Sequence, residues 1–375
     1  MNKSPRIAIA HHWIVSRRGG EQVLEQLCKL FPDADVSTLV YNPKARDLDF
    51  LKGRFVRQSV LSRIPMATKV YKSLLPFFPE VVSRLKVSPC NFLISSDASV
   101  VKGLRIPEGI PHVCYCHSPP RYLWDMADVY KSKSSGLGPL GRMIFAGMVP
   151  RVREFDKESS RRVTEFIANS KFVANRIKNF YDRTAEVINP PVAIGNFELH
   201  QAKEDFYLSV GQLVPYKRID IAVDAFNQLG LKLVVIGNGS ELAALKRKAH
   251  SNIQFLGSQS FSVLKDHLQR CKAFVFPGIE DFGITPLEAQ ACGTPVIAFR
   301  GGGALETVVE HKTGLFFDEQ TTESLIGAVE TFQREADSFD AQRCRDNATR
   351  FSPECFRDNF QSFLRRKFPD FEWAF

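Results

Sequence analysis

Two carboxylates, Glu280 and Glu288, lie eight residues apart in the stretch PGIEDFGITPLEAQACGTPVIAF (277–299) and are candidates for binding or catalysis. Apolar runs of strand length stand at both ends of this stretch, which predicts two interior strands of a parallel sheet joined by a loop and a helix. In such units ligands bind at the carboxyl ends of the strands, so Glu280 lies in a candidate binding loop. Gly283 would let the backbone of that loop approach a ligand closely.

Glu288 has two interpretations. Thr285, Pro286 and Glu288 fit a capping box in which Thr285 is the N-cap residue, so Glu288 could serve only to cap its helix. The alternative is that Glu288 binds a ligand together with Glu280. Capping would explain neither Glu280 nor Gly283.

Three more loops in the second half of the chain combine glycine with the start of an expected helix. They contain Gly211 followed by Lys217 and Arg218, then Gly237, Asn238 and Gly239, and finally Gly301, Gly302 and Gly303. Free N–H groups and the helix dipole make such helix starts suitable for phosphate. Several on one sheet edge predict a phosphate site. A GxxxxGK[ST] loop and a complete GxGxxG are both missing, which argues against an ATPase or a simple dehydrogenase.

Expected strands and helices alternate in two series that must position these loops. This pattern predicts an α/β protein with two doubly wound, Rossmann-like domains, residues 1–190 and 191–352, joined by a turn-rich linker over 188–199. Residues 353–375 read as a terminal helix whose apolar stripe needs a partner surface. At 375 residues the chain is long enough for two cores.

The composition of the chain indicates which classes of partner it can bind. The net charge of +9 favours anionic partners such as nucleotide phosphates, nucleic acid or acidic lipid. No basic face with interleaved aromatic residues is recognisable, so we expect no nucleic acid. The eight cysteines form no disulfide framework and no zinc spacing, which indicates reduced thiols in a cytosolic protein. We expect neither a signal peptide nor a transmembrane helix.

The sequence resembles the retaining glycosyltransferases of family 4, which have the GT-B fold. The resemblance rests on GGEQVLEQL, YCHSPPRYLWD, IANSKFV, VGQLVPYKRIDIAVDAF, VVIGNGSEL and, above all, PGIEDFGITPLEAQACGTPVIAFRGGGALETV. It covers nearly the whole chain and is weakest from about residue 42 to 110. Within the family the chain is most similar to mannosyltransferases of bacterial O-antigen and exopolysaccharide assembly. The resemblance implies a cleft between the two domains and a terminal helix that returns to the first domain.

The resemblance also implies roles for individual residues. Glu288 would bind the ribose hydroxyls of a nucleotide-sugar donor, Glu280 its sugar, and Lys217 its diphosphate as the glycosidic bond breaks. His117 would lie near the sugar, although a histidine after a strand can also be a simple turn residue. The donor would further be contacted by Gly19, Gly20, Gly211, Gln212, Arg218, Gly237, Asn238, Gly239, and the backbone of Phe282, Gly283, Ile284 and Thr285.

One position departs from the family pattern. Gln212 stands where the family usually has arginine, so one of two cations expected at the diphosphate is missing. Arg218 is the candidate replacement. Gln212 is also the one feature that favours a catalytically silent GT-B binding protein.

The sequence therefore predicts a hexosyltransferase that moves mannose from GDP-mannose to a saccharide or lipid-linked acceptor in cell-surface polysaccharide biosynthesis. The alternatives are a UDP-sugar donor or the silent binding protein. We expect no cofactor and no metal, because the DAD (33–35) and DLD (47–49) segments are interpreted as solvated charges.

We expect a cytoplasmic protein whose first domain can dock on the inner face of an anionic membrane. Residues 44–105 hold twelve Lys and Arg against four Asp and Glu, a net charge of +8. Within them an apolar stripe has helical spacing and Pro76 is expected to bend or end the helix. The stripe comprises Ala67, Val70, Tyr71, Leu74, Leu75 and Phe78. It could instead pack on the sheet of its own domain.

Overall fold

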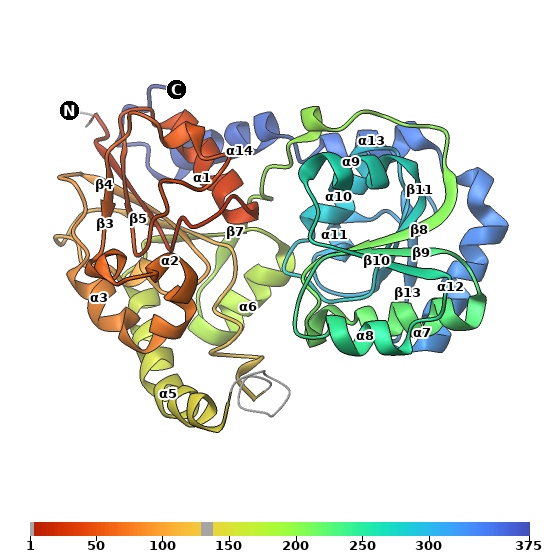
Figure 1. Cartoon of the computed structure of the whole chain (residues 1–375). Coiled ribbons are helices and arrows are strands. Elements are labelled where there is room, and N and C mark those ends of the chain that lie inside the picture. The colour runs from red at the N-terminus through yellow and green to blue at the C-terminus, as the bar shows by residue number, and fades with distance from the viewer. Residues whose placement is uncertain (1–3, 129–137) are drawn as a thin grey trace. The chain divides into compact units, whose positions relative to one another are not determined.

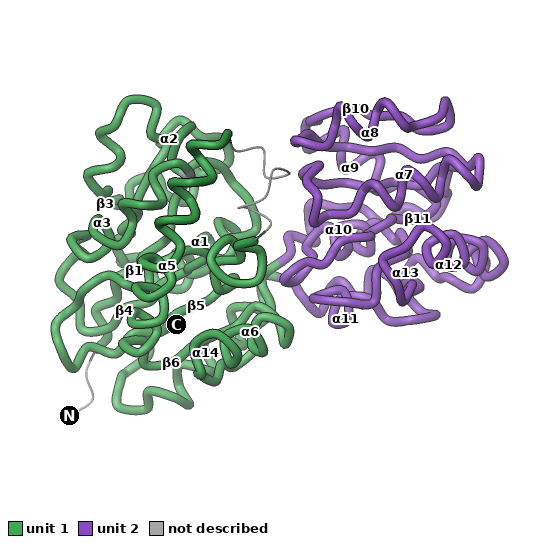
Figure 2. Tube along the Cα trace, turned by 90° about the horizontal axis from the view of Figure 1, so that it is seen from below, with its two compact units in different colours: residues 1–191, 353–375 green, residues 192–352 purple. Residues whose placement is uncertain are grey.

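A computed structural model of the chain describes residues 4–128 and 138–375. The chain forms two compact units, which are coloured separately in Figure 2. Unit 1 comprises residues 1–191 and 353–375, and unit 2 comprises residues 192–352. Each unit is built on one parallel sheet with helices packed on it (Figure 1), which confirms the predicted α/β class and the pair of Rossmann-like domains.

Unit 1 contains a seven-stranded parallel sheet with strand order β3-β2-β1-β4-β5-β6-β7. Its strands are β1 (Ile7–His11), β2 (Asp35–Thr38), β3 (Val56–Gln58), β4 (Phe92–Asp97), β5 (His112–Cys116), β6 (Glu165–Ala168) and β7 (Ala185–Val187). Because β1, β4, β5 and β6 are neighbours and run in the same direction, the residues that follow them gather at one edge of the sheet.

The helices of unit 1 connect these strands. They are α1 (Gly19–Leu30), α2 (Ala67–Val70), α3 (Phe78–Arg84), α5 (Pro139–Arg161), α6 (Lys171–Tyr181) and α14 (Pro353–Lys367). Short 3₁₀ turns accompany them: η1 (Asp49–Leu51), η2 (Val60–Arg63), η3 (Tyr71–Phe77) and η4 (Val101–Gly103).

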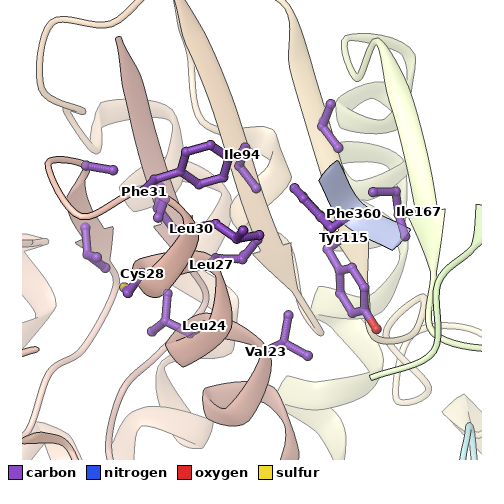
Figure 3. Close-up of a cluster of buried hydrophobic side chains, with 14 of the residues drawn as sticks. Val23, Leu24, Leu27, Cys28, Leu30, Phe31, Ile94, Tyr115, Ile167 and Phe360 are labelled. Atoms are coloured by element: carbon purple, nitrogen blue, oxygen red, sulfur yellow. The ribbon is translucent and has the colours of Figure 1, made fainter. Parts of the chain in front are cut away.

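The helix predicted from Pro353 onward is present as α14, and it belongs to unit 1. Its stripe of Phe356, Phe360, Phe363 and Leu364 is buried in the cluster that also holds the apolar face of α1. Figure 3 shows Phe360 in this cluster with Leu24 and Leu27 of α1 and Tyr115 of β5. A segment that is remote in sequence thus completes the core of the first unit.

The segment 67–78 differs from the single helix expected there. It is a short α2 followed by the 3₁₀ helix η3, and Pro76 lies inside η3 instead of bending or ending an α-helix. Ala67, Tyr71 and Phe78 are buried in the core of unit 1. These three residues of the stripe therefore pack inside their own domain, as in the alternative interpretation, and do not form a membrane-facing surface.

Unit 2 contains a six-stranded parallel sheet with strand order β10-β9-β8-β11-β12-β13. The strands are β8 (Glu204–Val210), β9 (Leu233–Ile236), β10 (Ile253–Gly257), β11 (Cys271–Phe276), β12 (Val296–Phe299) and β13 (Gly314–Phe317). The α-helices are α7 (Ile219–Leu229), α8 (Leu242–Lys248), α9 (Phe261–Arg270), α10 (Ile284–Ala291), α11 (Ala304–Thr307), α12 (Thr322–Glu335) and α13 (Ala341–Thr349). The 3₁₀ turns are η6 (Ile194–Asn196), η7 (Pro215–Lys217) and η8 (Ala336–Ser338).

The start of α10 corrects the predicted capping box. The helix begins at Ile284 with Gly283 as its N-cap residue, and Thr285 is already inside the first turn. The reason is the left-handed conformation of Gly283, with φ of 93°, which turns the chain into the helix earlier than expected. Glu288 consequently lies beyond the first turn and cannot cap α10.

Within residues 4–128 and 138–375, no helix combines the length and the apolar character that crossing a membrane requires.

Candidate functional site

The structure brings Lys217 and Glu280 together as an ion pair in unit 2. Lys217 ends η7 after β8, and Glu280 lies in the loop after β11, which is the neighbour of β8 in the sheet. The two loops approach so closely that a Cβ at Gly278 would lie 2.9 Å from the Cα of Lys217. Glycine at position 278 is therefore a condition for the ion pair.

The glycines after β12 support the loop that carries Glu280. The amide of Gly303 donates a hydrogen bond of 2.9 Å to the carbonyl oxygen of Glu280. A Cβ at Gly303 would lie 2.2 Å from the Cα of Phe282, and one at Gly302 would lie 2.4 Å from the carbonyl oxygen of Glu280. Close packing thus explains these glycines, which the sequence suggested as a phosphate loop.

Glu288 is a partly exposed residue of α10, and burial of its carboxyl group raises the pKa from 4.5 to about 7. No charged partner contributes to this shift. A carboxyl group with such a pKa changes its hydrogen-bonding capacity near neutral pH. When ionised it accepts two hydroxyl hydrogen bonds, and when protonated it is itself a donor.

The start of α10, which lies between Glu280 and Glu288 in the chain, offers backbone donors. Ile284 and Thr285 occupy the first turn, where N–H groups have no partner within the helix. Phe282 is buried and packs against Phe351, which holds the loop before the helix in place. This arrangement fits the binding of sugar oxygens or phosphate oxygens at residues 282–285.

The loops after β8 and β9 pack backbone against backbone. A Cβ at Gly237 would lie 1.8 Å from the carbonyl oxygen of Gly211, and one at Gly239 would lie 2.1 Å from that of Leu213. The Gly237 amide donates to Gly257, and the Gly239 amide donates 2.8 Å to the side-chain oxygen of Asn238. Both amides are therefore already used within the protein, and the two glycines have a packing role.

Gln212 and Arg218, the two remaining residues of the expected diphosphate site, have different surroundings. The side chain of Gln212 is exposed. Arg218, the candidate replacement cation, donates to Asp220 at 3.1 Å through both Nε and Nη2. The guanidinium of Arg218 is thus held at the first turn of α7 by a carboxylate.

In unit 1 three histidines gather around Gly20. His11 and His12 come from the end of β1, and His117 follows β5. The ring centroid of His12 lies 4.2 Å from that of His11 and 5.9 Å from that of His117. A Cβ at Gly20 would lie within 3.7 Å of all three rings. The Gly19–Gly20 start of α1 therefore faces a cluster of imidazoles, of which the sequence had indicated only His117.

His117 is held by three strand ends. Its Nε2 lies 2.7 Å from the hydroxyl of Ser96. Its amide donates 2.8 Å to the carbonyl oxygen of Asp97, and its carbonyl oxygen accepts from the side chain of Asn169 at 2.8 Å. Ser170 caps α6, whereas Asn169 holds the His117 turn. The contacts of Ser96 and Asn169 with His117 were not predicted, and the only indication of them in the sequence is the place of both residues at strand ends.

A buried ionic network supports the same turn. Lys102 pairs with Asp97 at 3.3 Å and with Asp156, and all three side chains are almost fully excluded from solvent. Asp156 also accepts hydrogen bonds from Trp124 at 2.9 Å and Tyr181 at 2.7 Å. Because breaking a buried pair leaves an uncompensated charge, this network fixes the end of β4 next to His117.

The imidazoles of His12 and His117 are held neutral. Burial and the neighbouring His11 lower the pKa of His12 to about 4. Burial, together with His12 and His11, also holds the pKa of His117 well below 6.5. Although burial opposes it, proximity to His11 and His12 lowers the pKa of Glu21, whose carboxylate lies 3.9 Å from His11 Nε2. Neutral imidazoles are suited to hydrogen bonds with hydroxyl groups.

No group of three or more His, Cys, Asp or Glu side chains within the described part of the chain has a geometry that could hold a metal ion.

The chain is similar to known glycosyltransferases. A family model described as Glycosyl transferases group 1 matches residues 194–351, which is nearly all of unit 2. An uncharacterized glycosyltransferase of Methanocaldococcus jannaschii is 30% identical over 180 residues, or 46% of this chain and 50% of that protein. A GDP-mannose-dependent alpha-(1-6)-phosphatidylinositol monomannoside mannosyltransferase of Mycobacterium tuberculosis is 34% identical over 138 residues, or 32% of this chain and 36% of that protein.

Similar solved structures cover almost the whole chain. The structure of the Anabaena protein HepE in complex with UDP-glucose has a TM-score of 0.67 and 17% sequence identity, and the match covers 96% of this chain and 99% of that one. The likeness to this structure concerns the fold. In sequence, the chain spans half or less of the length of the two relatives described above.

Proposed function

We propose that the protein is a retaining hexosyltransferase of family 4, because a model of the Glycosyl transferases group 1 family matches residues 194–351 and the fold is that of GT-B glycosyltransferases. The observation that carries the proposal is the Lys217–Glu280 ion pair, which lies in the matched family region together with Glu288 and the start of α10. One cation, two carboxylates and free helix N–H groups are the groups that a nucleotide-sugar needs.

In this proposal unit 2 binds the donor. Glu288 accepts hydrogen bonds from the ribose hydroxyls, and Glu280 accepts them from the sugar. The amides at residues 282–285 and the ammonium of Lys217 hold the diphosphate. As the bond between the sugar and the diphosphate breaks, Lys217 neutralises the charge that develops on the leaving nucleoside diphosphate. In unit 1, the neutral His117 side chain is suited to hydrogen-bond a sugar hydroxyl.

We further propose that the donor is GDP-mannose. Support comes from the mycobacterial relative, whose name gives that donor. The alternative is a UDP-sugar, which HepE binds in its solved structure. The proposed acceptor is a saccharide or a lipid-linked saccharide of cell-surface polysaccharide biosynthesis.

One experiment separates these donors. The protein is incubated with GDP-mannose or UDP-glucose, and release of the nucleoside diphosphate is measured with and without a lipid-linked saccharide extract. We expect release from GDP-mannose that acceptor stimulates, and its loss in Glu280→Gln. Release from neither donor, together with unchanged thermal stability in the presence of either, would contradict the proposal.

We also propose that unit 1 attaches the enzyme peripherally to the inner face of the plasma membrane. Most of the exposed large apolar side chains of the described residues lie in two segments of unit 1, 55–77 and 140–144, which belong to elements that contact each other. They are Phe55, Val60, Ile64, Met66, Phe77, Leu140, Met143 and Ile144. Apolar side chains next to a basic segment favour an interfacial contact.

Two cations of the basic segment 44–105 are unavailable for such a contact. Lys102 is buried in the ionic network, and Arg54 donates to the carbonyl oxygens of Phe31 at 3.1 Å and Cys28 at 3.0 Å. The proposed membrane contact therefore rests on the exposed apolar side chains and on the surface cations among residues 57–86.

A further inference from the structure

A pocket of about 280 Å³ lies at the edge of the unit 1 sheet. One side is formed by the edge strand β3 and the start of η2, and the other by α3 and the residues that follow it. None of the histidines around Gly20 lines this pocket. It is therefore a separate feature from the site described above.

The pocket is positively charged. Its lining contains Arg57, Arg84 and Lys86 but only one acid, Glu80. Glu80 pairs with Arg84 at 2.6 Å, and both side chains are more than half exposed, so this is a weak surface pair. Within the described residues, neither Arg57 nor Lys86 takes part in an ion pair. Two cations are thus left without a carboxylate.

Of the two cations, Arg57 is the more specific indication of an anion site. Its guanidinium lies 5.2 Å from the ring centroid of Phe55. Its Nε is shielded from solvent and has no hydrogen-bond acceptor among the described residues. Because Nε is shielded, a ligand in the pocket that Arg57 lines would meet the terminal N–H groups of the guanidinium instead. The fork of N–H groups on arginine matches the oxygens of a phosphate.

Exposed apolar side chains lie close to these cations. Val60 lines the pocket and is 64% exposed, and Phe55, which packs on Arg57, is 56% exposed. A ligand that places an anion on Arg57 and Lys86 would therefore have apolar side chains nearby. This combination suits a phosphate that belongs to an amphiphilic molecule.

We propose that this pocket binds a phosphate ester, with Arg57 and Lys86, which both line it, supplying the positive charge. The ester comes either from a lipid headgroup at a membrane surface or from a soluble molecule. The pocket is a second anion site on the protein and does not depend on glycosyl transfer.

The test uses glycerol 3-phosphate as the soluble probe and vesicles containing phosphatidylglycerol as the lipid probe. Binding of the soluble probe is measured by titration calorimetry, and binding to vesicles by sedimentation. The double variant Arg57→Gln with Lys86→Gln should weaken binding at least tenfold. The control Lys178→Gln removes a 60% exposed cation from α6, which packs against β6 and β7 towards the other end of the sheet, and should bind as the wild type does.

The outcomes separate the two sources. Vesicle binding that glycerol 3-phosphate displaces, and that the double variant loses, assigns the site to lipid headgroups. Tight binding of the soluble ester without an effect on sedimentation assigns it to a soluble ligand. Wild-type binding in the double variant, or equal losses in Lys178→Gln, would overturn the proposal. If the double variant is unstable, Lys86→Gln alone gives the same comparison.

Discussion

Lys217 and Glu280 form an ion pair across two neighbouring loops of unit 2, although the proposed reaction needs the lysine at the diphosphate and the carboxylate at the sugar. A bound donor would therefore either contact both side chains while they remain paired or separate them. Lys217→Ala should lower the rate of transfer at least a hundredfold, because it removes the charge that stabilises the leaving group. Both side chains are only about 20% exposed, so leaving Glu280 without its partner should also lower the stability, by about 1–3 kcal/mol. Initial rates and thermal unfolding measure the two effects, and a stable Lys217→Ala with wild-type rates would contradict the assignment.

The raised pKa of Glu288 predicts pH-dependent donor binding. Ribose hydroxyls donate to the ionised carboxylate, so nucleotide affinity should rise with pH and level off above about 7. Calorimetric titration with GDP between pH 5.5 and 8.5 would show this, with pH values chosen around the pKa. In Glu288→Gln the affinity should be low and independent of pH. The same pH profile in wild type and variant would exclude Glu288.

The pKa of Glu288 also affects folding. The folded state holds the proton more tightly than the unfolded chain, so the contribution of Glu288 to stability is greatest below pH 4.5 and is lost as the pH rises to about 7. Relative to Glu288→Gln, the wild type should lose up to about 1.4 kcal/mol per pH unit in this interval. Urea unfolding at several pH values measures the difference.

Gly303→Ala should displace the loop that carries Glu280. The added methyl group would lie 2.2 Å from the Cα of Phe282, so backbone must move. We expect loss of transfer and a destabilisation of about 1–3 kcal/mol. Gly327→Ala is the matched control, because its methyl group meets nothing within 4 Å and lies in α12, where alanine favours the helix. Equal behaviour of both variants would show that the turn does not position Glu280.

Ser96 should position His117. Ser96→Ala removes the partner of Nε2, so we expect kcat to fall about tenfold with a smaller change in KM. Ser95→Ala is a close control, because Ser95 makes a hydrogen bond of the same 2.7 Å length to a different histidine, His112. Ser96→Thr keeps the hydroxyl and should restore the rate. If Ser95→Ala slows transfer as strongly, the effect is only structural.

Membrane attachment through unit 1 predicts salt-sensitive binding to anionic vesicles. Met66 and Phe77 are 66% and 60% exposed, so Met66→Ser with Phe77→Ser should weaken sedimentation with vesicles and leave thermal stability unchanged. Tyr71 in the same segment is buried, and Tyr71→Ser should instead destabilise the fold. Equal binding to anionic and neutral vesicles, or no binding at low salt, would rule out this attachment.

Local patterns predicted most of the fold. Apolar runs and glycine turns gave the two series of strands and helices, and the aromatic stripe after Pro353 gave α14. The apolar pattern of segment 67–78 did not predict its environment, because an apolar stripe that faces a membrane and one that packs on the core of its own domain have the same spacing. Only the tertiary contacts of Tyr71 and Phe78 distinguish the two.

The candidate site was predictable where a loop follows a strand. Lys217 and Glu280 were both placed in such loops, and the pairing of β8 with β11 brings them together. The histidine cluster was not predictable, because it depends on the order of β1, β4 and β5 in the sheet. The start of α10 was missed because a capping motif is read from side chains, whereas the conformation of Gly283 decides it.

The return of α14 to unit 1 has a consequence for biosynthesis. Unit 2 is continuous in sequence, whereas unit 1 receives Phe356, Phe360 and Phe363 only from residues that are translated after unit 2. During translation the second unit can therefore finish folding while the first still exposes the apolar surface of α1. A chain that stops before residue 353 would keep that surface exposed and become a substrate for chaperones and proteases.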